Sequence, residues 1–574
     1  SAASDGYKRQ VCSYASTNNT VAGESVHSIL QGRTVTGKIL DETGEPLIGV
    51  SVLVKGTTVG TITDIDGNYS LEIPSGKNIL VISYIGYKTQ DIAVGKSNQL
   101  NVKMEADTQA LDEVIVVGYG TVKKRDVTGA VSSMKSKDVV IAPTNNVMEA
   151  LSGKIAGMDI MKTSGQVGED DDVKILLRGS RSIYGDNTPL FIIDGIPGNY
   201  NQINPSDIET VDVLKDASST AIYGSAGANG VVIITTKRGV AGKATVNFDA
   251  YYGFSGTPDF YHGMVGDEWT RYQRESYKYI NGQYPADMSA ILTDPVKLEA
   301  YNQGKWIDWV DEAAGNTATT QKYSLSVTGG SKKTKIFASA AYTREEGLLS
   351  NDNRGKYAMR LNIDQEIFSW AKVGFTSNLT YTDRNQGVKN TFTKALSVFP
   401  LGDAYDENGN INHEYAPNEY SPLGDFIPDQ YVNNTKGTYI NVNGNLELTP
   451  LKGLSFKSVI SATLNNSRAG TFLGAQCNAN LPTYASSPHA SILNSYTRGY
   501  TWENILSYNK TIAENHSIGG TFVTSWSHNQ EESNMAAGSG QDLDAWSFWR
   551  LTSATSPHVE SDFAQTQNCL LYTS

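Results

Sequence analysis

The chain has 574 residues, of which 47 are Lys or Arg and 60 are Asp or Glu, so its formal net charge is −13. This acidic balance argues against a nucleic-acid-binding protein, because such proteins present a basic face. No segment approaches the roughly 18 consecutive apolar residues of a membrane-spanning helix. The alternating strands of a membrane β-barrel stay compatible with the composition, because their two faces average to mild hydrophilicity.

Neither a metal site nor a disulfide framework is indicated by the sequence. The three cysteines lie far apart and form no CxxC pair, and the seven histidines form no HExxH motif. Residues 1–33 are polar and without a pattern, and we interpret them as a leader. The chain starts with Ser instead of Met and has no apolar signal segment, which favours a fragment of a longer protein.

Residues 34–106 carry short alternating strands separated by turn signals, a pattern that predicts a small β-sandwich. Asp64, Asp66 and Asn68 within it allow two interpretations. In a calcium-binding EF-hand loop the glycine and the closing glutamate would fall at other positions, and a helix would follow. We therefore favour a hairpin turn, in which Asp and Gly supply the backbone conformations that a turn requires.

Residues 107–120 pass from a polar linker into an extended, β-branched stretch that is too short for a helix. Its spacing fits a core strand and an exposed strand that adds to a partner's sheet equally well. The stretch runs over 112–120, and its first six residues are Asp112, Glu113, Val114, Ile115, Val116 and Val117.

Residues 121–240 show a mixed α/β pattern. One short helix closing on glycine is predicted over 147–157, and a second is predicted near 217–222. The glycines at 224–230 do not form the fingerprint of a dinucleotide-binding turn. Buried strands are predicted over 173–179, 189–195, 208–214 and 231–237.

From residue 241 to the end the pattern changes to longer strands with one apolar and one polar face. About nine strands of roughly ten residues are predicted, and their connections alternate between long and short, as in an outer-membrane β-barrel. The eight Trp all follow residue 268, which would suit aromatic girdles. A large soluble sandwich is the alternative. The predicted strands are 246–254, 323–327, 336–342, 357–363, 373–381, 440–448, 454–464, 500–508 and 518–526.

This strand count predicts an incomplete barrel over residues 241–574. A closed single-chain barrel has an even number of strands, because closure removes every sheet edge. We therefore expect a truncated, open, curved sheet with an unpaired edge near 518–526.

Ordered motifs along the chain resemble one known family. GEPLIGV at 44–50 and DIDGNY at 64–69 are similar to the carboxypeptidase-regulatory-like domain that opens SusC/RagA outer-membrane transporters. LDEVIVVGYGTVKKRDVTG at 111–129 resembles the TonB box and plug entry of that family. The resemblance covers about 34–560, and residues 564–574 do not share it. The plug pattern continues with LSGKIAG at 151–157, LRGS at 177–180, IDGIP at 193–197, IETVDVLKDAS at 208–218 and GANGVVIITTK at 227–237.

The resemblance implies a mainly β protein. It would consist of an N-terminal β-sandwich, a linker with the TonB box over 107–120, a mixed α/β plug over 121–240 and the first strands of an antiparallel transmembrane β-barrel. In the family the barrel has about 22 strands. The resemblance implies no catalytic activity, cofactor, metal site or nucleic-acid partner.

The implied function is TonB-dependent import of a glycan or peptide nutrient, with the plug gating the barrel. The implied location is the outer membrane of a Gram-negative bacterium of the Bacteroidota, with the N-terminal domain in the periplasm. The implied partners are outer-membrane lipid, a SusD-like surface lipoprotein, and TonB with its inner-membrane energising proteins. TonB would bind residues 112–117, and the residues that bind cargo are not identified.

Two other functions stay open: a TonB-dependent siderophore or cofactor receptor, and a non-transporting surface binding protein built of β-sandwiches. An enzyme is disfavoured, because the sequence offers no nucleophile–base pair and no set of metal ligands. Five charged residues of the plug segment allow contacts with a barrel wall or ordinary ion pairs within the plug, and we favour the second. These residues are Arg178, Asp194, Asp212, Lys215 and Asp216.

Overall fold

The computed structural model describes two compact units, the first made of residues 1–113 and 123–125 and the second of residues 114–122 and 126–574. The described residues are 33–573, without 42–43, 58, 75–78, 85–86, 88, 96, 106–113, 118–119, 124–130, 137–145, 168–172, 257–261, 315–316, 480–486, 513–515 and 542–543. None of the described helices has the length and apolar character needed to cross a membrane.

The first unit is a small β-sandwich, as the sequence predicts. Its strands alternate so that apolar side chains face inward: Tyr69, Leu71 and Ile73 of β4 are buried, and the polar residues between them are exposed. One sheet has the order β4-β1-β7 and the other the order β3-β2-β5-β6. The strands are β1 (Arg33–Leu40), β2 (Ser51–Val54), β3 (Gly60–Ile62), β4 (Asn68–Ile73), β5 (Ile79–Ser83), β6 (Gln90–Ala93) and β7 (Val102–Lys103).

The acidic cluster of this unit forms a turn before β4. Asp64 Oδ1 accepts hydrogen bonds from the backbone N–H groups of Asp66 at 3.0 Å and Asn68 at 2.8 Å. Gly67 has a φ of 75°, the left-handed conformation that favours glycine. The carboxylate is thus used to close the turn, which agrees with the hairpin interpretation.

The second unit contains a mixed α/β region, residues 131–237, here called the inner domain. Its five-stranded sheet has the order β10-β15-β16-β13-β14 and packs around Leu151, Val211, Val213, Val232 and Ile234. The strands are β10 (Val131–Lys135), β11 (Met158–Lys162), β12 (Val173–Leu177), β13 (Leu190–Ile193), β14 (Ile196–Pro197), β15 (Ile208–Leu214) and β16 (Val231–Thr236), and the helices are α3 (Val147–Leu151), η2 (Tyr200–Gln202), η3 (Pro205–Asp207), α4 (Ala217–Thr220) and η4 (Ala221–Gly227).

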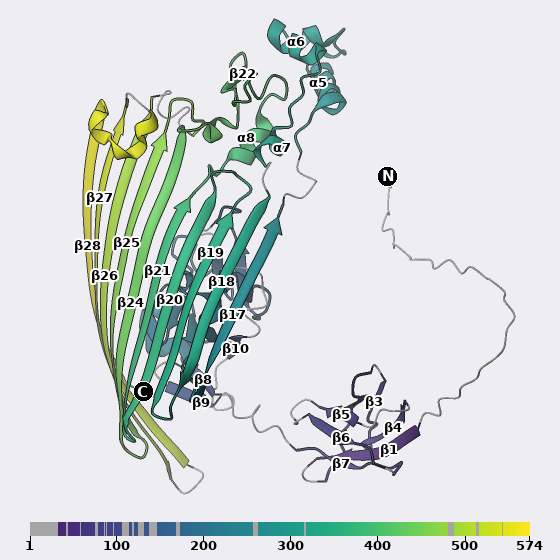
Figure 1. The fold of residues 1–574 in the computed structure, drawn as a ribbon, viewed down its shortest axis with the longest axis vertical. Coiled ribbons are helices and arrows are strands. Elements are labelled where there is room, and N and C mark those ends of the chain that lie inside the picture. The colour runs from purple at the N-terminus through teal and green to yellow at the C-terminus, as the bar shows by residue number, and fades with distance from the viewer. Residues whose placement is uncertain are drawn as a thin grey trace, which may run out of the picture. The chain divides into compact units, whose positions relative to one another are not determined.

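A single 10-stranded antiparallel sheet, here called the large sheet, makes up most of the second unit (Figure 1). Within this sheet each strand pairs with the strand that follows it along the chain. The strands are β17 (Gly242–Ser255), β18 (Ala318–Gly330), β19 (Thr334–Glu346), β20 (Asn353–Phe368), β21 (Ala371–Asn385), β24 (Tyr431–Leu451), β25 (Leu454–Leu473), β26 (His489–Ile512), β27 (His516–Ser539) and β28 (Ser556–Thr573).

Three predictions about this sheet are wrong in detail. There are ten strands, not nine, and they run from 13 to 24 residues, longer than the predicted length of about ten. The predicted unpaired edge at 518–526 is covered from residue 522 onward, because β28 pairs with β27 from Phe522 opposite Thr573 to Ser539 opposite Ser556. Weak hydrophobic alternation over 556–573 concealed the tenth strand.

The long connections gather at one end of the large sheet and the tight turns at the other (Figure 1). Two long connections form a separate cluster, here called the outer module, of residues 262–314 and 386–430. It contains α5 (Gly266–Asn281), η5 (Met288–Ala290), α6 (Pro295–Asn302), α7 (Trp309–Ala313), α8 (Thr391–Ser397), β22 (Glu414–Ala416), β23 (Glu419–Tyr420) and η6 (Gly424–Phe426). The last connection contains η7 (Asp544–Trp549) and η8 (Leu551–Ser553).

Five of the eight tryptophans lie in folded connections, and Trp370 lies in the turn between β20 and β21, stacked on Phe368. Trp269, Trp306 and Trp309 pack inside the outer module, and two more belong to η7. Trp502 and Trp526 lie opposite each other on neighbouring strands of the large sheet. Most of the tryptophans therefore serve folded connections instead of marking strand ends.

Candidate functional site

The two faces of the large sheet have opposite chemistry. On β20 the side chains of Tyr357 and Met359 point away from the inner domain, and that of Met359 is 58% exposed. Arg360 and Asn362 point the other way, and Arg360 is only 5% exposed. β21 repeats the pattern, since Leu379 is exposed while Thr376, Asn378 and Thr380 are buried. A sheet in a soluble protein buries its apolar face instead.

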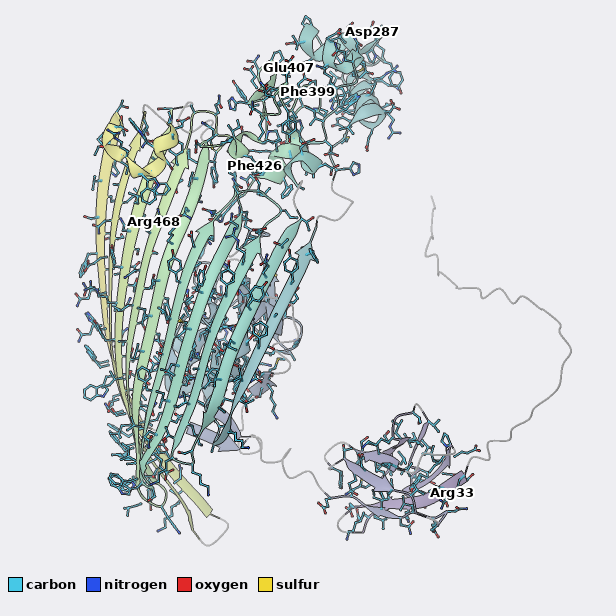
Figure 2. All side chains as sticks on the ribbon, in the orientation of Figure 1. Arg33, Asp287, Phe399, Glu407, Phe426 and Arg468 are labelled. Atoms are coloured by element: carbon cyan, nitrogen blue, oxygen red, sulfur yellow. The ribbon has the colours of Figure 1, made fainter. Side chains whose placement is uncertain are left out.

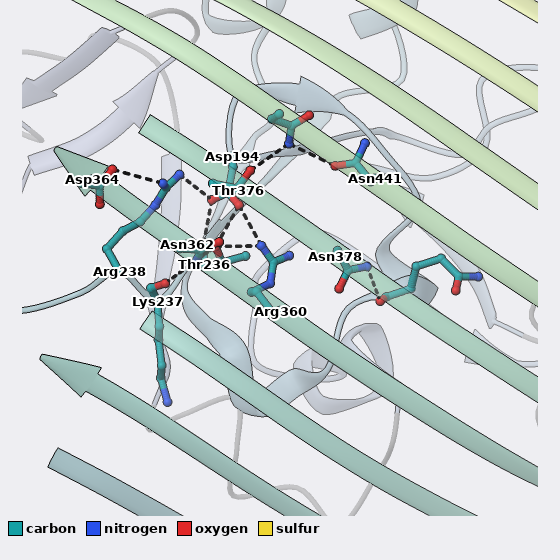
Figure 3. Close-up of polar contacts among 12 residues, drawn as sticks. Asp194, Thr236, Lys237, Arg238, Arg360, Asn362, Asp364, Thr376, Asn378 and Asn441 are labelled. Atoms are coloured by element: carbon teal, nitrogen blue, oxygen red, sulfur yellow. Dashed lines mark hydrogen bonds and ion pairs between the residues drawn. The ribbon is translucent and has the colours of Figure 1, made fainter. Parts of the chain in front are cut away.

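The buried polar face contacts the inner domain through an ion-pair network (Figure 3). The carboxylate of Asp194, which follows β13, accepts hydrogen bonds from the backbone N–H of Thr236 at 3.0 Å and its hydroxyl at 2.8 Å. Arg360 of β20 reaches the same carboxylate at 3.2 Å, and Arg238 lies 3.6 Å from it. Both Asp194 and Arg360 are almost completely buried. Each neutralises the charge of the other, and burying either charge without its partner would be costly in free energy.

A second row of contacts joins large-sheet side chains to backbone carbonyls of the inner domain. Asn362 donates to the carbonyl of Lys237 at 2.7 Å (Figure 3). Asn378 and Thr380 donate to the carbonyl of Gln202 at 3.0 and 3.1 Å. Polar contacts of this kind can be exchanged for hydrogen bonds to water, because their net stabilisation is only about 1 kcal/mol each.

The loop after β11, here called the Gln166 loop, attaches the inner domain to the end of the large sheet that carries the long connections. Gln166 donates to the carbonyl of Gly387 at 2.5 Å and accepts from Gln386 at 2.9 Å. The backbone N–H of Val167 donates to Asp352 Oδ2 at 2.9 Å. A pocket of about 740 Å³ lies beside these bonds, lined by residues 163–166 together with side chains such as Leu349, Asp352 and Lys389.

Burial raises the pKa of the Asp352 carboxyl from 3.8 to about 6. Loss of hydration disfavours the charged form, and this effect outweighs the hydrogen bonds from Val167 and Gly387 and the nearby charge of Arg384. Glu345 acts in the same direction as burial. The contact between the loop and the large sheet therefore includes a carboxyl whose pKa is raised well above its ordinary value.

The predicted TonB-box residues are only partly described. Asp112 and Glu113 lie outside the described residues. Residues Val114–Val117 form β8, which pairs with β9 (Gly120–Lys123) in a two-stranded sheet. Parts of β8 and β15 lie within 8 Å of each other, Cα to Cα. The extended conformation agrees with both sequence interpretations, so contact with TonB stays a prediction.

Of the five charged residues singled out in the inner domain, only Asp194 meets the large sheet in a contact described above. Arg178 pairs with Asp216 at 2.6 Å within the inner domain. Lys215 donates to the hydroxyl of Ser132 at 2.7 Å, also within it. Sequence reasoning missed Arg360, because it lies 166 residues from Asp194 and nothing in the sequence pairs the two.

Comparisons with known proteins agree with this arrangement. The CarboxypepD_reg-like domain family matches residues 35–116, and the TonB-dependent Receptor Plug Domain family matches residues 123–231. The chain is 34% identical to the TonB-dependent receptor P26 of Formosa agariphila over 86% of the chain and 49% of that protein. It is 38% identical to the TonB-dependent receptor SusC of Bacteroides thetaiotaomicron over 60% of the chain and 33% of that protein.

Among solved structures, the RagAB peptide importer in its open-open state is similar, with 25% identity and a TM-score of 0.68 over 80% of this chain and 54% of that one. The chain therefore spans about half the length, or less, of the proteins it matches. The two domain families occur in the order found in the structure, with the plug domain against the polar face of the large sheet. The chain belongs to the SusC-like TonB-dependent receptors.

Proposed function

We propose that the protein is a TonB-dependent importer of the outer membrane of a Gram-negative bacterium of the Bacteroidota. The observation that carries the proposal is the reversed large sheet, with its apolar face exposed and its polar face against the inner domain. Lipid would cover the apolar side chains, and the polar face would line the lumen of a transmembrane barrel. The two ends of the sheet agree with this, since outer-membrane barrels carry long outer loops and short periplasmic turns.

The inner domain would act as the gate. It fills the polar side of the large sheet and is attached by the Asp194–Arg360 pair, by side-chain bonds to backbone carbonyls and by the Gln166 loop. Water entering the lumen would replace these bonds at small net cost, whereas an apolar interface of the same size would resist opening. A pull on the inner domain can therefore open a path without unfolding the large sheet.

The force would come from TonB through residues 112–117. An extended segment offers unpaired backbone groups to which a partner strand adds. Because β8 already pairs with β9 in this structure, TonB would add to the other edge of β8 or displace β9. The first unit and this segment would lie in the periplasm, within reach of TonB and its inner-membrane energising proteins.

The cargo would be an oligosaccharide or a peptide, delivered by a SusD-like surface lipoprotein. Support comes from the similarity to the TonB-dependent receptor SusC and to RagAB, which is a peptide importer. The 740 Å³ pocket at the Gln166 loop has the size of a small-ligand site and lies where the inner domain meets the long connections.

The test compares uptake in cells that express the receptor with and without TonB. Radiolabelled oligosaccharides and peptides are offered at low concentration, and binding at the surface is measured beside uptake. We expect uptake of one cargo class to vanish without TonB while surface binding remains. A siderophore receptor would transport ferric chelates instead, and a surface binding protein would show no uptake that depends on TonB.

A further inference from the structure

The first strand of the inner domain, β10, is weakly attached to the rest of its sheet. It lies at one edge and pairs with β15 through five residues, from Val131 opposite Leu214 to Lys135 opposite Thr210. None of the residues of β10 is buried, whereas most residues of β15 are. Edge elements with few buried contacts are the parts of a protein that open most easily.

The contacts that hold the inner domain to the large sheet come from other elements. Arg360 of the large sheet reaches the Asp194 carboxylate and the Thr236 hydroxyl, each at 3.2 Å. Asn378 donates to the carbonyl of Gln202, at the end of η2, at 3.0 Å. Asp194 follows β13 and Thr236 ends β16, and β15 lies between these strands and β10. Separation of β10 from β15 would therefore leave these contacts in place.

A pull on the predicted TonB box would enter β10 at its N-terminal end. Residues 112–117 precede β10 in the chain, so tension on them reaches Val131 before any other described residue of the five-stranded sheet. Because β10 and β15 are antiparallel, this end lies opposite Leu214, the last residue of β15, and Lys215 follows directly. Figure 1 labels β8, β9 and β10 toward the end of the large sheet that has the tight turns, and Figure 2 shows the side chains of this region in the same orientation.

Lys215 holds the end of β10 at which the pull would enter. Its ammonium group donates to the hydroxyl of Ser132, the second residue of β10, at 2.7 Å, and to the carbonyl of Ala156, between α3 and β11. Lys215 is only 8% exposed, and its neighbour Asp216 pairs with Arg178 at 2.6 Å. Hydrogen bonds from a charged group are roughly twice as strong as neutral ones, and a low local dielectric strengthens them further.

We propose that Lys215 is a latch, whose bond to Ser132 sets the load at which the inner domain begins to open by separation of β10 from β15. The proposal rests on the importer function proposed above, and Lys215 is a positioning residue because it acts through Ser132. Release of the chain would stop at α3, which packs in the core and whose N-cap, Asn146, accepts a hydrogen bond from the Met148 N–H at 2.8 Å. The released chain, residues 131–145, would extend to about 50 Å.

A force measurement tests the latch without TonB and without cargo. The receptor, with its three native cysteines replaced, is held in a lipid bilayer and pulled at constant load through a handle on Asp112→Cys. Wild type is compared with Ser132→Ala and Lys215→Met, which remove the bond from its two sides. Ser152→Ala is the matched control, because Ser152 is an exposed serine of the inner domain outside β10. Equal melting temperatures of the four proteins check that they fold.

We expect a first extension of about 50 Å in all four proteins. Ser132→Ala and Lys215→Met should shorten the waiting time before this extension about tenfold, and Ser152→Ala should leave it unchanged. The waiting times of all later extensions should stay the same. A general loss of stability in the inner domain would shorten those later waiting times as well.

Two disulfides distinguish the possible routes of opening. Lys135→Cys with Thr210→Cys joins β10 to β15, and Met161→Cys with Lys174→Cys joins β11 to β12, because each pair lies directly opposite on antiparallel strands. We expect the first disulfide to abolish the first extension until a reductant is added. The second should leave that extension unchanged, because β11 and β12 stay folded while β10 leaves.

The inference is overturned if the first extension releases the whole inner domain at once, or if neither Ser132→Ala nor Lys215→Met shortens the waiting time. It is also overturned if both disulfides block the first extension, or if neither does. Since the handle replaces TonB, these outcomes concern the latch alone. Loss of the proposed function, shown by uptake that does not depend on TonB, would leave them unchanged.

Discussion

The first unit and the large sheet share the same alternation of polar and apolar residues along their strands, but they bury opposite faces. The first unit buries the apolar face, and the large sheet buries the polar face. In β4 of the first unit Leu71 is buried and Glu72 is exposed. In β20 of the large sheet Met359 is exposed and Arg360 is buried. Both segments have a period of two, which fixes only that the two faces differ. Which face turns inward depends on the surroundings: water outside the sandwich, and lipid outside the large sheet in the function proposed here.

The largest expected effect concerns the segment that joins the two regions in sequence. Ile115→Pro removes a backbone N–H from β8 and prevents ladder pairing, so TonB could no longer add a strand. We expect uptake to be abolished and cargo binding at the cell surface to stay. Ile115→Ala should be mild, because main-chain bonds give most of the affinity. Normal uptake by the proline variant would rule out these residues as the TonB box.

That experiment also separates the two interpretations of residues 112–117. If the segment were a core strand needed for folding, both variants would unfold the receptor and remove it from the outer membrane. Immunoblots of outer-membrane fractions, run beside the uptake measurement, distinguish loss of receptor from loss of coupling.

A charge in the core of the first unit should be the next largest effect. Val52 is completely buried, and Val52→Asp would place a carboxylate among apolar side chains without a partner. We expect a loss on the order of 4 kcal/mol, enough to unfold a small domain. Limited proteolysis should cut residues 33–105 rapidly, while the large sheet keeps its resistance. Equal cleavage of both regions would mean that the two do not fold independently.

Matched arginine substitutions sharpen the comparison, because they put the same charge on exposed apolar positions of the two regions. Ile65 of the first unit is 75% exposed, and Met359 of the large sheet is 58% exposed. Ile65→Arg should be neutral, since its side chain faces water. Met359→Arg should cost about 2–4 kcal/mol if that position lies in the middle of the membrane. Urea titration of receptor folding into vesicles measures the difference, and equal effects would contradict a lipid-facing sheet.

The smallest effect should be a pH dependence at the Gln166 loop. The folded-state pKa of Asp352, about 6, lies above the ordinary value of 3.8, so the folded state holds its proton more tightly. The contribution of Asp352 to stability is therefore most favourable below about pH 4 and is lost as the pH rises from about 4 to about 6. Asp352→Asn removes the ionisation and keeps an oxygen for the Val167 N–H.

Hydrogen exchange at the Val167 amide tests this, because wild type and variant share the same intrinsic rate at each pH. We expect slower exchange in Asp352→Asn at pH 7.5 and equal rates at pH 4. A difference that persists at pH 4 would show that shape, and not charge, is responsible.

Much of this architecture was predictable from the sequence, because period and turn signals are local. The alternation at 357–363 and 373–381 predicts β20 and β21, and the turn at Asp64 follows from its residue types. The tenth strand was missed because Glu560 and Asp562 interrupt a weak apolar pattern, and its pairing with β27 supplies what the pattern lacks. Long-range pairs have no local signal.

Strand lengths were underestimated for a related reason. β26 and β27 each have 24 residues, although hydrophobic alternation is clear over only part of them. The stretch Asn529–Glu532 is polar, yet it stays in the sheet because its neighbours on β26 and β28 continue the ladder. A prediction based on hydrophobicity detects the apolar part of a strand and misses the polar residues with which the same strand continues.

The claim that the large sheet faces lipid on its apolar side is tested most directly by fluorescence quenching along β20. Single cysteines at 356–363, in a receptor whose Cys12, Cys477 and Cys569 are replaced, are labelled with bimane in vesicles of brominated lipid. We expect strong quenching at 357, 359, 361 and 363 and weak quenching at the positions between them, where the inner domain covers the sheet. Quenching without this period of two, or strongest at Arg360 and Asn362, would contradict the account.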